Sequence, residues 1–145
     1  MSMKILETPY GICHLSVVPV RLEPSEGAGM LTQLLFGELL QVIDREEHWS
    51  YVRLLFDNVE GWVANSQFVE ISDRDYKKCL KKKEKYAHRW LTKLRLKTGE
   101  DLFLHIPKGA TFSYNHLLHT SQSTQRNLHQ GIIPTALEYL NAPFL

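Results

Sequence analysis

Two cysteines and seven histidines are among the side chains of this 145-residue chain that could act as nucleophiles, proton carriers or metal ligands. Cys13 and Cys79 are far apart, and their spacing matches neither a disulfide framework nor a zinc site, so we expect two free, buried thiols. His116 and His119 lie three residues apart, which on a helix would place two imidazoles on one face. No cysteine or carboxylate nearby completes a ligand set, and there is no nucleophile elbow or phosphate-binding glycine loop. The sequence therefore predicts no metal site, no cofactor and no catalytic residue.

A second group of side chains that could bind a ligand is a run of six lysines in the middle of the chain: Lys77, Lys78, Lys81, Lys82, Lys83 and Lys85. Such a run could form a nucleic-acid patch, and a nucleic-acid-binding module is one hypothesis. On a helix, however, these lysines would spread over more than half of the circumference, and acidic residues are interspersed with them. The formal net charge is only +1. We therefore favour a solvated helix face and expect no nucleic-acid partner.

The segments around these residues predict a mainly β chain. Short runs rich in β-branched and aromatic residues are separated by polar turns at 12–22, 30–36, 38–44, 49–54, 60–64 and 68–71. Close spacing of this kind is typical of a small barrel rather than a βαβ sheet. Pro19 cannot donate to a β-ladder, so we place it on an edge or at a bulge.

The second half predicts another set of strands after a helical break. Ser72 followed by Asp75 is a helix-capping pattern, and we expect a linker helix over 72–88. Strands are then expected at 90–96, 101–106, 111–114 and 131–133. Pro134 suits the first turn of a final helix over 134–145. The expected units are thus a first barrel at 11–71, the linker, a second and degenerate barrel at 89–133, and a C-terminal helix.

A set of spaced glycine, tryptophan and aliphatic residues carries a family resemblance. The set comprises Gly37, Leu40, Val42, Trp49, Val52, Gly61, Trp62 and Val63. In this order it resembles the bacterial SH3-type (SH3b) domain over residues 11–71, and two SH3-like β-barrels are the implied architecture. Gly61 would let two strands approach closely where the barrel bends. We expect Trp62 to supply apolar area to the core and Trp49 to be partly exposed.

Over nearly its whole length the chain resembles the SH3b region of NlpC/P60 cysteine peptidases of the dipeptidyl-peptidase VI type. In that family a proline–aromatic step leads into a D-C-S-G nucleophile segment, whereas here Pro143-Phe144 is followed only by Leu145. Cys13 and Cys79 lack that setting. The resemblance therefore implies a non-catalytic module of a peptidase that cleaves γ-D-glutamyl–diamino acid bonds in peptidoglycan stem peptides. Its implied partners are an NlpC/P60 catalytic domain in cis and the stem peptide.

The same resemblance suggests a ligand-binding role for Glu60, with Tyr51 and Trp49 as aromatic walls. A peptidase that requires a free N-terminus must recognise a primary ammonium, which needs an acceptor such as a carboxylate. The alternative is a stand-alone SH3-like module that binds proline-rich segments in an aromatic groove. Neither a signal segment nor an apolar stretch of roughly 20 residues is evident, so we expect no membrane span. The expected location is cytoplasmic, or periplasmic or cell-wall if a signal was removed.

Overall fold

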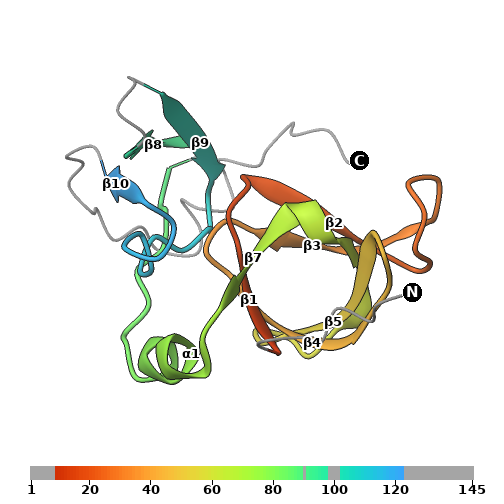
Figure 1. The fold of residues 1–145 in the computed structure, drawn as a ribbon. Helices are drawn as coiled ribbons and strands as arrows, with labels where there is room; N and C mark the ends of the chain where they lie inside the picture. The colour runs from red at the N-terminus through yellow and green to blue at the C-terminus, as the bar shows by residue number, and fades with distance from the viewer. Residues whose placement is uncertain (1–8, 90, 98–101, 123–145) are drawn as a thin grey trace.

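The computed structural model describes residues 9–89, 91–97 and 102–122, which form a mainly β structure with two sheets and a single α-helix. The larger sheet has the strand order β3-β2-β6-β5-β4-β1-β7. Its strands curve around a common core, so that Figure 1 looks into one end of a barrel. The bounds are β1 (Tyr10–Cys13), β2 (Val17–Arg21), β3 (Met30–Leu35), β4 (Leu39–Arg45), β5 (Trp49–Leu54), β6 (Glu60–Ala64) and β7 (Phe68–Ile71).

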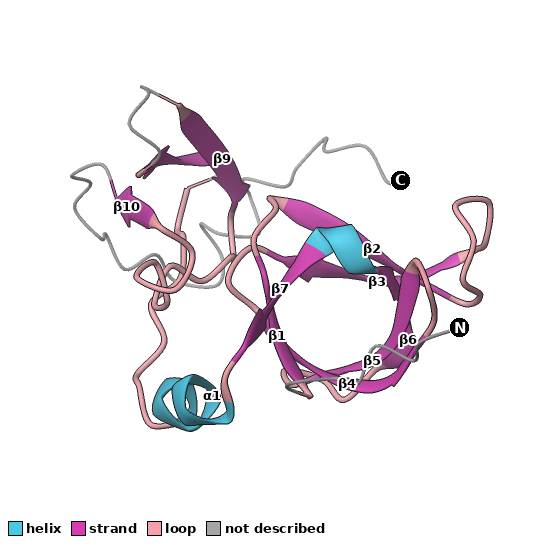
Figure 2. Cartoon of the chain, in the orientation of Figure 1, coloured by secondary structure: helices cyan, strands magenta, loops and turns pink. Residues whose placement is uncertain are grey.

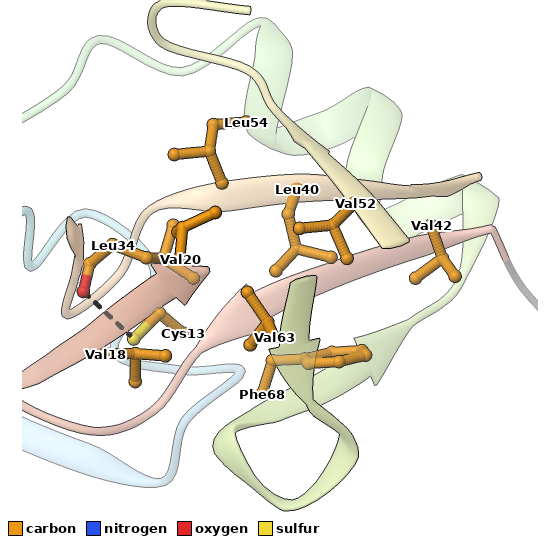
Figure 3. Packing of buried hydrophobic residues seen from close by; sticks show 10 residues of the cluster. All are labelled: Cys13, Val18, Val20, Leu34, Leu40, Val42, Val52, Leu54, Val63 and Phe68. Carbon is orange, nitrogen blue, oxygen red and sulfur yellow. Dashed lines mark hydrogen bonds between the residues drawn. The ribbon is translucent and has the colours of Figure 1, made fainter. Parts of the chain in front are cut away.

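The barrel core follows from the alternation of buried and less buried residues along β2, β5 and β6. In β5, for example, Ser50, Val52 and Leu54 are buried while the residues between them are not. Because successive side chains of a strand point to opposite faces, this period places one face of each strand inside the barrel. Figure 3 shows the resulting cluster of Cys13, Val18, Val20, Leu34, Leu40, Val42, Val52, Leu54, Val63 and Phe68 pointing toward one another.

The apolar run at 12–22, which the sequence presents as one segment, divides into two strands. β1 pairs with β4 and β7, whereas β2 pairs with β3 and β6. Pro19 lies inside β2, and the pairing of β2 with β6 is limited to Arg21 opposite Trp62. A register shift occurs next to it, between Val20 and Arg21. Pro19 itself pairs with Gln33 in regular register, so it lies beside this irregularity and not in it, and β2 is not an edge strand.

A short 3-10 helix, η1 (Asn65–Gln67), precedes β7, and one α-helix, α1 (Asp73–Leu80), follows it (Figure 2). The Ser72 hydroxyl accepts a hydrogen bond from the Asp75 amide at 3.1 Å, as the capping pattern predicted. The helix is shorter than the expected 72–88, so the lysines beyond Leu80 do not lie on it. Lys77 pairs with Asp73 and Lys78 pairs with Asp75, as expected for a solvated helix face.

The second sheet has the order β10-β8-β9, with β8 (Leu91–Leu96), β9 (Phe103–Pro107) and β10 (Thr120–Gln122). The predicted strand at 111–114 is wrong. Thr111 makes only an isolated bridge to Tyr86, and the chain then turns. The Phe112 amide bonds to the Lys85 carbonyl, which leaves this segment out of the sheet.

Parts of the predicted organisation fall outside the described residues. These parts are the strand at 131–133, the helix at 134–145, Trp90 and His129. The second barrel stays a prediction, because the described part of the chain contains a three-stranded sheet there.

The second sheet packs onto the barrel through the β3–β4 turn. Phe36, at the start of that turn, belongs to a core cluster with Ala87, Leu94, Ile106 and Ala110. Its carbonyl accepts a hydrogen bond from the Thr111 amide at 3.0 Å, and the Ser16 hydroxyl donates to the His105 carbonyl at 2.5 Å. The barrel and the second half of the chain therefore share a core cluster and these two hydrogen bonds.

Candidate functional site

Three aromatic side chains lie together on the outside of the barrel. Trp49 and Tyr51 come from β5 and Trp62 from β6, and the register places Tyr51 opposite Trp62. The ring centroids of Tyr51 and Trp62 are 5.3 Å apart, and the two ring planes are tilted by 59°. All three side chains are half-buried, and their strand neighbours face the core. We call Trp49, Tyr51 and Trp62 the aromatic face.

Glu60 lies on the same side of the sheet, one pair further along the strands. Arg53, directly opposite on β5, donates from Nε to Glu60 Oε1 at 2.7 Å, and its Nη2 lies 2.5 Å from the same oxygen. The Tyr51 hydroxyl lies 3.4 Å from Glu60 Oε2. Arg53 thus pairs with the Glu60 carboxylate through Oε1, whereas the partner of Oε2 among the described residues is the Tyr51 hydroxyl, at a long distance. That second oxygen is the one available to a ligand.

Charged residues border the aromatic face on the two neighbouring strands. Arg21 of β2 pairs with Trp62, and Asp44 of β4 pairs with Tyr51. The Arg21 guanidinium is itself held by the Ala28 carbonyl at 2.8 Å, in the loop between β2 and β3. The row across the four strands therefore reads Asp, Tyr, Trp, Arg, with opposite charges at its two ends.

The structure brings the three predicted site residues together, but it corrects the expected place of Trp62. That side chain lies on the outer face, and Gly61 and Val63 face inward instead. The reason is the close approach of β2 to β6: a Cβ at Gly61 would lie 2.7 Å from Val20 Cγ1 and 2.9 Å from the Arg21 carbonyl oxygen. Glycine at 61 must therefore face the packed interior, which forces Trp62 outward.

The cysteines are free and buried, as expected. Burial raises the pKa of Cys13 to about 12, a bond to the Leu15 carbonyl opposes this shift, and Glu38 adds to it. Burial also raises the pKa of Cys79, which lies in the cluster between β1, β4, β7 and α1. Both groups are therefore thiols at neutral pH, whereas the thiolate is the nucleophilic form.

The histidine pair lies in a run of turns rather than on a helix. His116 and His119 belong to the turn segment at 113–119, and His119 has a left-handed backbone with φ of 50°. The geometry that would set two imidazoles on one helix face is thus absent there. Within the described ranges, no group of three or more histidine, cysteine or carboxylate side chains is placed to hold a metal ion.

The barrel, its strand order and its outward aromatic residues provide the setting for the comparison with known families. Residues 20–68 match the family described as the bacterial dipeptidyl-peptidase Sh3 domain. The SH3 match runs from β2 to the start of β7 and so includes every residue of the aromatic face, together with Glu60. It covers less than half of the chain. A search of curated proteins found no match.

The SH3 match identifies a domain type whose usual role is binding rather than catalysis. It is consistent with the resemblance expected over 11–71, and the catalytic NlpC/P60 partner has no counterpart in the match. Among the helices of the described residues, none is long and apolar enough to cross a membrane.

Proposed function

We propose that this chain is the non-catalytic SH3b module of an NlpC/P60 murein-peptide hydrolase, and that its barrel binds and positions the stem peptide. The observation that carries the proposal is the SH3 match of residues 20–68, a domain type named for bacterial dipeptidyl-peptidases. The catalytic cysteine and histidine would come from an NlpC/P60 domain in cis. The chain alone would therefore bind stem peptides without turnover.

Glu60 and the aromatic face give this role a physical basis. A stem peptide with a free amino terminus presents a primary ammonium, which a carboxylate recognises well. Among the described residues, the hydrogen-bond partner of Glu60 Oε2 is the Tyr51 hydroxyl at 3.4 Å, whereas Oε1 is held by Arg53. An ammonium can therefore bind at Oε2 and lie beside the ring of Tyr51, which adds a cation–π contribution. An acylated or longer peptide loses this charge and adds bulk at the same position.

The test is a titration followed by tryptophan fluorescence and amide NMR shifts, with L-Ala-γ-D-Glu-diaminopimelate and its N-acetylated form as ligands. We expect the free tripeptide to bind and the acetylated one to bind about tenfold more weakly, since a charge-assisted hydrogen bond is lost. Glu60→Gln should erase that difference. Glu70→Gln is the matched control, because Glu70 also pairs with an arginine, Arg45, on the outside of the barrel.

Two results would defeat the proposal. One is equal binding of the free and acetylated tripeptides by the unaltered chain. The other is detectable hydrolysis of the γ-D-glutamyl–diamino acid bond by the purified chain, because that would require catalytic residues here.

A second candidate is a stand-alone module that binds proline-rich segments. The observation that favours it is the aromatic face itself, because polyproline II ligands dock between exposed aromatic rings. Binding of a P-x-x-P peptide would depend on Trp62 and Tyr51 but not on Glu60. A proline-rich peptide that binds Glu60→Gln as well as the unaltered chain, while the tripeptide fails to bind, would select this alternative.

A further inference from the structure

A pocket of about 640 Å³ lies where the barrel, α1 and the segment that leads into the second sheet meet. Its wall from the barrel includes Glu38 and Leu39 at the start of β4 and Leu55 and Phe56 after β5. The opposite wall is formed by the end of α1, residues 82–84 and 86, and Thr111 with Tyr114. The pocket shares no residue with the aromatic face. Its volume is in the range of sites for small organic ligands.

One wall of the pocket carries the carboxylate of Glu38, which has no ion-pair partner among the described residues. Glu38 is partly buried, and one of its oxygens accepts a hydrogen bond from the Leu35 amide at 2.8 Å. None of the ion pairs among the described residues includes it. Burial raises the pKa of Glu38, the Leu35 bond opposes this shift, and the nearby charges of Asp57 and Glu84 add to it. Two neighbouring carboxylates thus act on Glu38, and no ion pair among the described residues offsets them.

The second carboxylate, Glu84, is surrounded by phenols. It accepts a hydrogen bond from the Tyr86 hydroxyl, and its charge contributes to the raised pKa of Tyr114. The pKa of Tyr114 is about 12, chiefly because the side chain is buried. Its hydroxyl donates to the Cys79 carbonyl at 3.2 Å, which fixes the ring in the pocket wall. The Tyr114 hydroxyl is therefore a neutral hydrogen-bond donor at physiological pH.

Two lysines just after α1, Lys82 and Lys83, supply positive charge to the pocket lining. Lys82 is already engaged, because its Nζ donates to the Ser113 carbonyl at 3.1 Å. Lys83 is exposed and takes part in none of the ion pairs between described residues. Apolar side chains also line the pocket: Leu39 is buried, whereas Phe56 is 79% exposed. An exposed phenylalanine beside a pocket leaves apolar area for a ligand to cover.

We propose that this pocket binds a small zwitterion, an amino acid or short peptide with free termini, whose ammonium pairs with Glu38 and whose carboxylate pairs with Lys83. The aliphatic or aromatic part of the ligand would lie against Leu39, Leu55 and Phe56. A ligand with only a positive charge would be attracted by Glu38 but repelled by Lys83. A ligand with only a negative charge would be attracted by Lys83 but repelled by Glu38 and Glu84. The proposal stands apart from the role of the aromatic face, because the two sites have different residues.

Three probes of matched carbon skeleton test whether both charges are needed: L-norleucine, hexanoate, which lacks its ammonium, and pentylamine, which lacks its carboxylate. Amide NMR shifts of the ¹⁵N-labelled full chain report the site. We expect L-norleucine to shift residues around Glu38 and Tyr114 and to bind about tenfold more tightly than either analogue. Trialanine, a zwitterion of greater length, separates a preference for peptides from one for free amino acids. Either preference supports the proposal.

Single variants then assign the two charges. Glu38→Gln keeps an acceptor for the Leu35 amide and removes the charge, and Lys83→Met removes an exposed ammonium. Each should weaken L-norleucine binding about tenfold. Glu46→Gln and Lys81→Met are matched controls, since Glu46 and Lys81 are exposed and lie outside the pocket. Their affinities should equal that of the unaltered chain.

Several outcomes would overturn the proposal. These are equal affinities for the three probes, no shifts with L-norleucine or trialanine, shifts confined to Trp49, Tyr51 and Trp62, or control variants that weaken binding as much as Glu38→Gln does. Shifts confined to the aromatic face would leave the proposed stem-peptide function intact. If Glu38→Gln alters the fold, as judged from its whole spectrum, Lys83→Met carries the assignment because Lys83 is exposed.

Discussion

Replacing Gly37 by alanine should separate the second sheet from the barrel. Gly37 has φ of +82°, a left-handed conformation that costs an L-residue about 1–2 kcal/mol. The added Cβ would also overlap the Thr111 carbonyl oxygen and approach Thr111 Cγ2 to 2.9 Å. Thr111 must then move, and its buried amide loses the Phe36 carbonyl, which costs a further 1–3 kcal/mol or so. The expected total is about 2–5 kcal/mol of the unfolding free energy.

Urea unfolding measures the total, and amide hydrogen exchange measures where the loss occurs. We expect early loss of protection at Thr111 and its neighbours, while the barrel amides of β4 and β5 stay protected. Gly27→Ala is the matched control, since a Cβ there meets only Ser25 Oγ, at 3.9 Å. If the free energy of unfolding of Gly37→Ala lies within about 0.5 kcal/mol of that of the unaltered chain, the size expected for an ordinary surface change, then the inferred contact between the β3–β4 turn and Thr111 is wrong.

Three further perturbations test other parts of the structure. Ser72→Ala should cost about 1 kcal/mol by removing the cap of α1, and Ser72→Asp should restore it in thermal unfolding; equal midpoints for all three proteins would contradict the capping geometry. Cys13, with its pKa of about 12, should react with iodoacetamide at pH 8 only as fast as the barrel opens; alkylation at the rate of a free thiol would show that it is accessible. Burial raises the pKa of Glu38, so its ionisation opposes folding as the pH rises through that pKa; Glu38→Gln should therefore gain stability at pH 7 relative to the unaltered chain and lose this advantage below the ordinary carboxyl pKa, as measured by urea unfolding across pH.

The sequence predicts local elements well where side chains alternate regularly. In Trp49–Leu54 only one choice of buried face fits the residue types, because Val52 and Leu54 are apolar and lie on the same face. The structure buries that face. Thr111–Tyr114 has equally strand-like residue types but does not form a strand. Its backbone groups pair with Phe36 and Lys85, which lie far away in sequence. Residue types alone do not contain that information, because β-propensity reports fit to a pleated surface and not the presence of a partner.

The sequence suggested which side chains lie near one another, was wrong about the orientation of Trp62, and leaves the ligand-binding role of Glu60, Tyr51 and Trp49 a prediction. Tyr51, Trp49 and Glu60 do lie on one side of the sheet. Trp62 was expected inside because a large aromatic side chain is the obvious filler of a small core. The phase of β6 is decided instead by Gly61, whose missing side chain admits β2. The pocket could not be predicted at all, since it is lined by segments from 38 to 114 that only the folded chain brings together.

The two proposed sites depend on the fold in different ways. The aromatic face belongs entirely to β5 and β6, which pair over five residues, so it persists whenever the barrel is folded. The pocket needs Thr111 to be held at the β3–β4 turn and Tyr114 to pack against Leu39 and Cys79, and we expect it to open when the Thr111 contact is lost. A ligand of the pocket must therefore stabilise the docked second sheet, because it binds that arrangement and not the separated one. For the same reason, Gly37→Ala should weaken the binding of L-norleucine far more than the binding of the stem tripeptide. The same substitution thus tests both the contact at Thr111 and the dependence of the pocket on it.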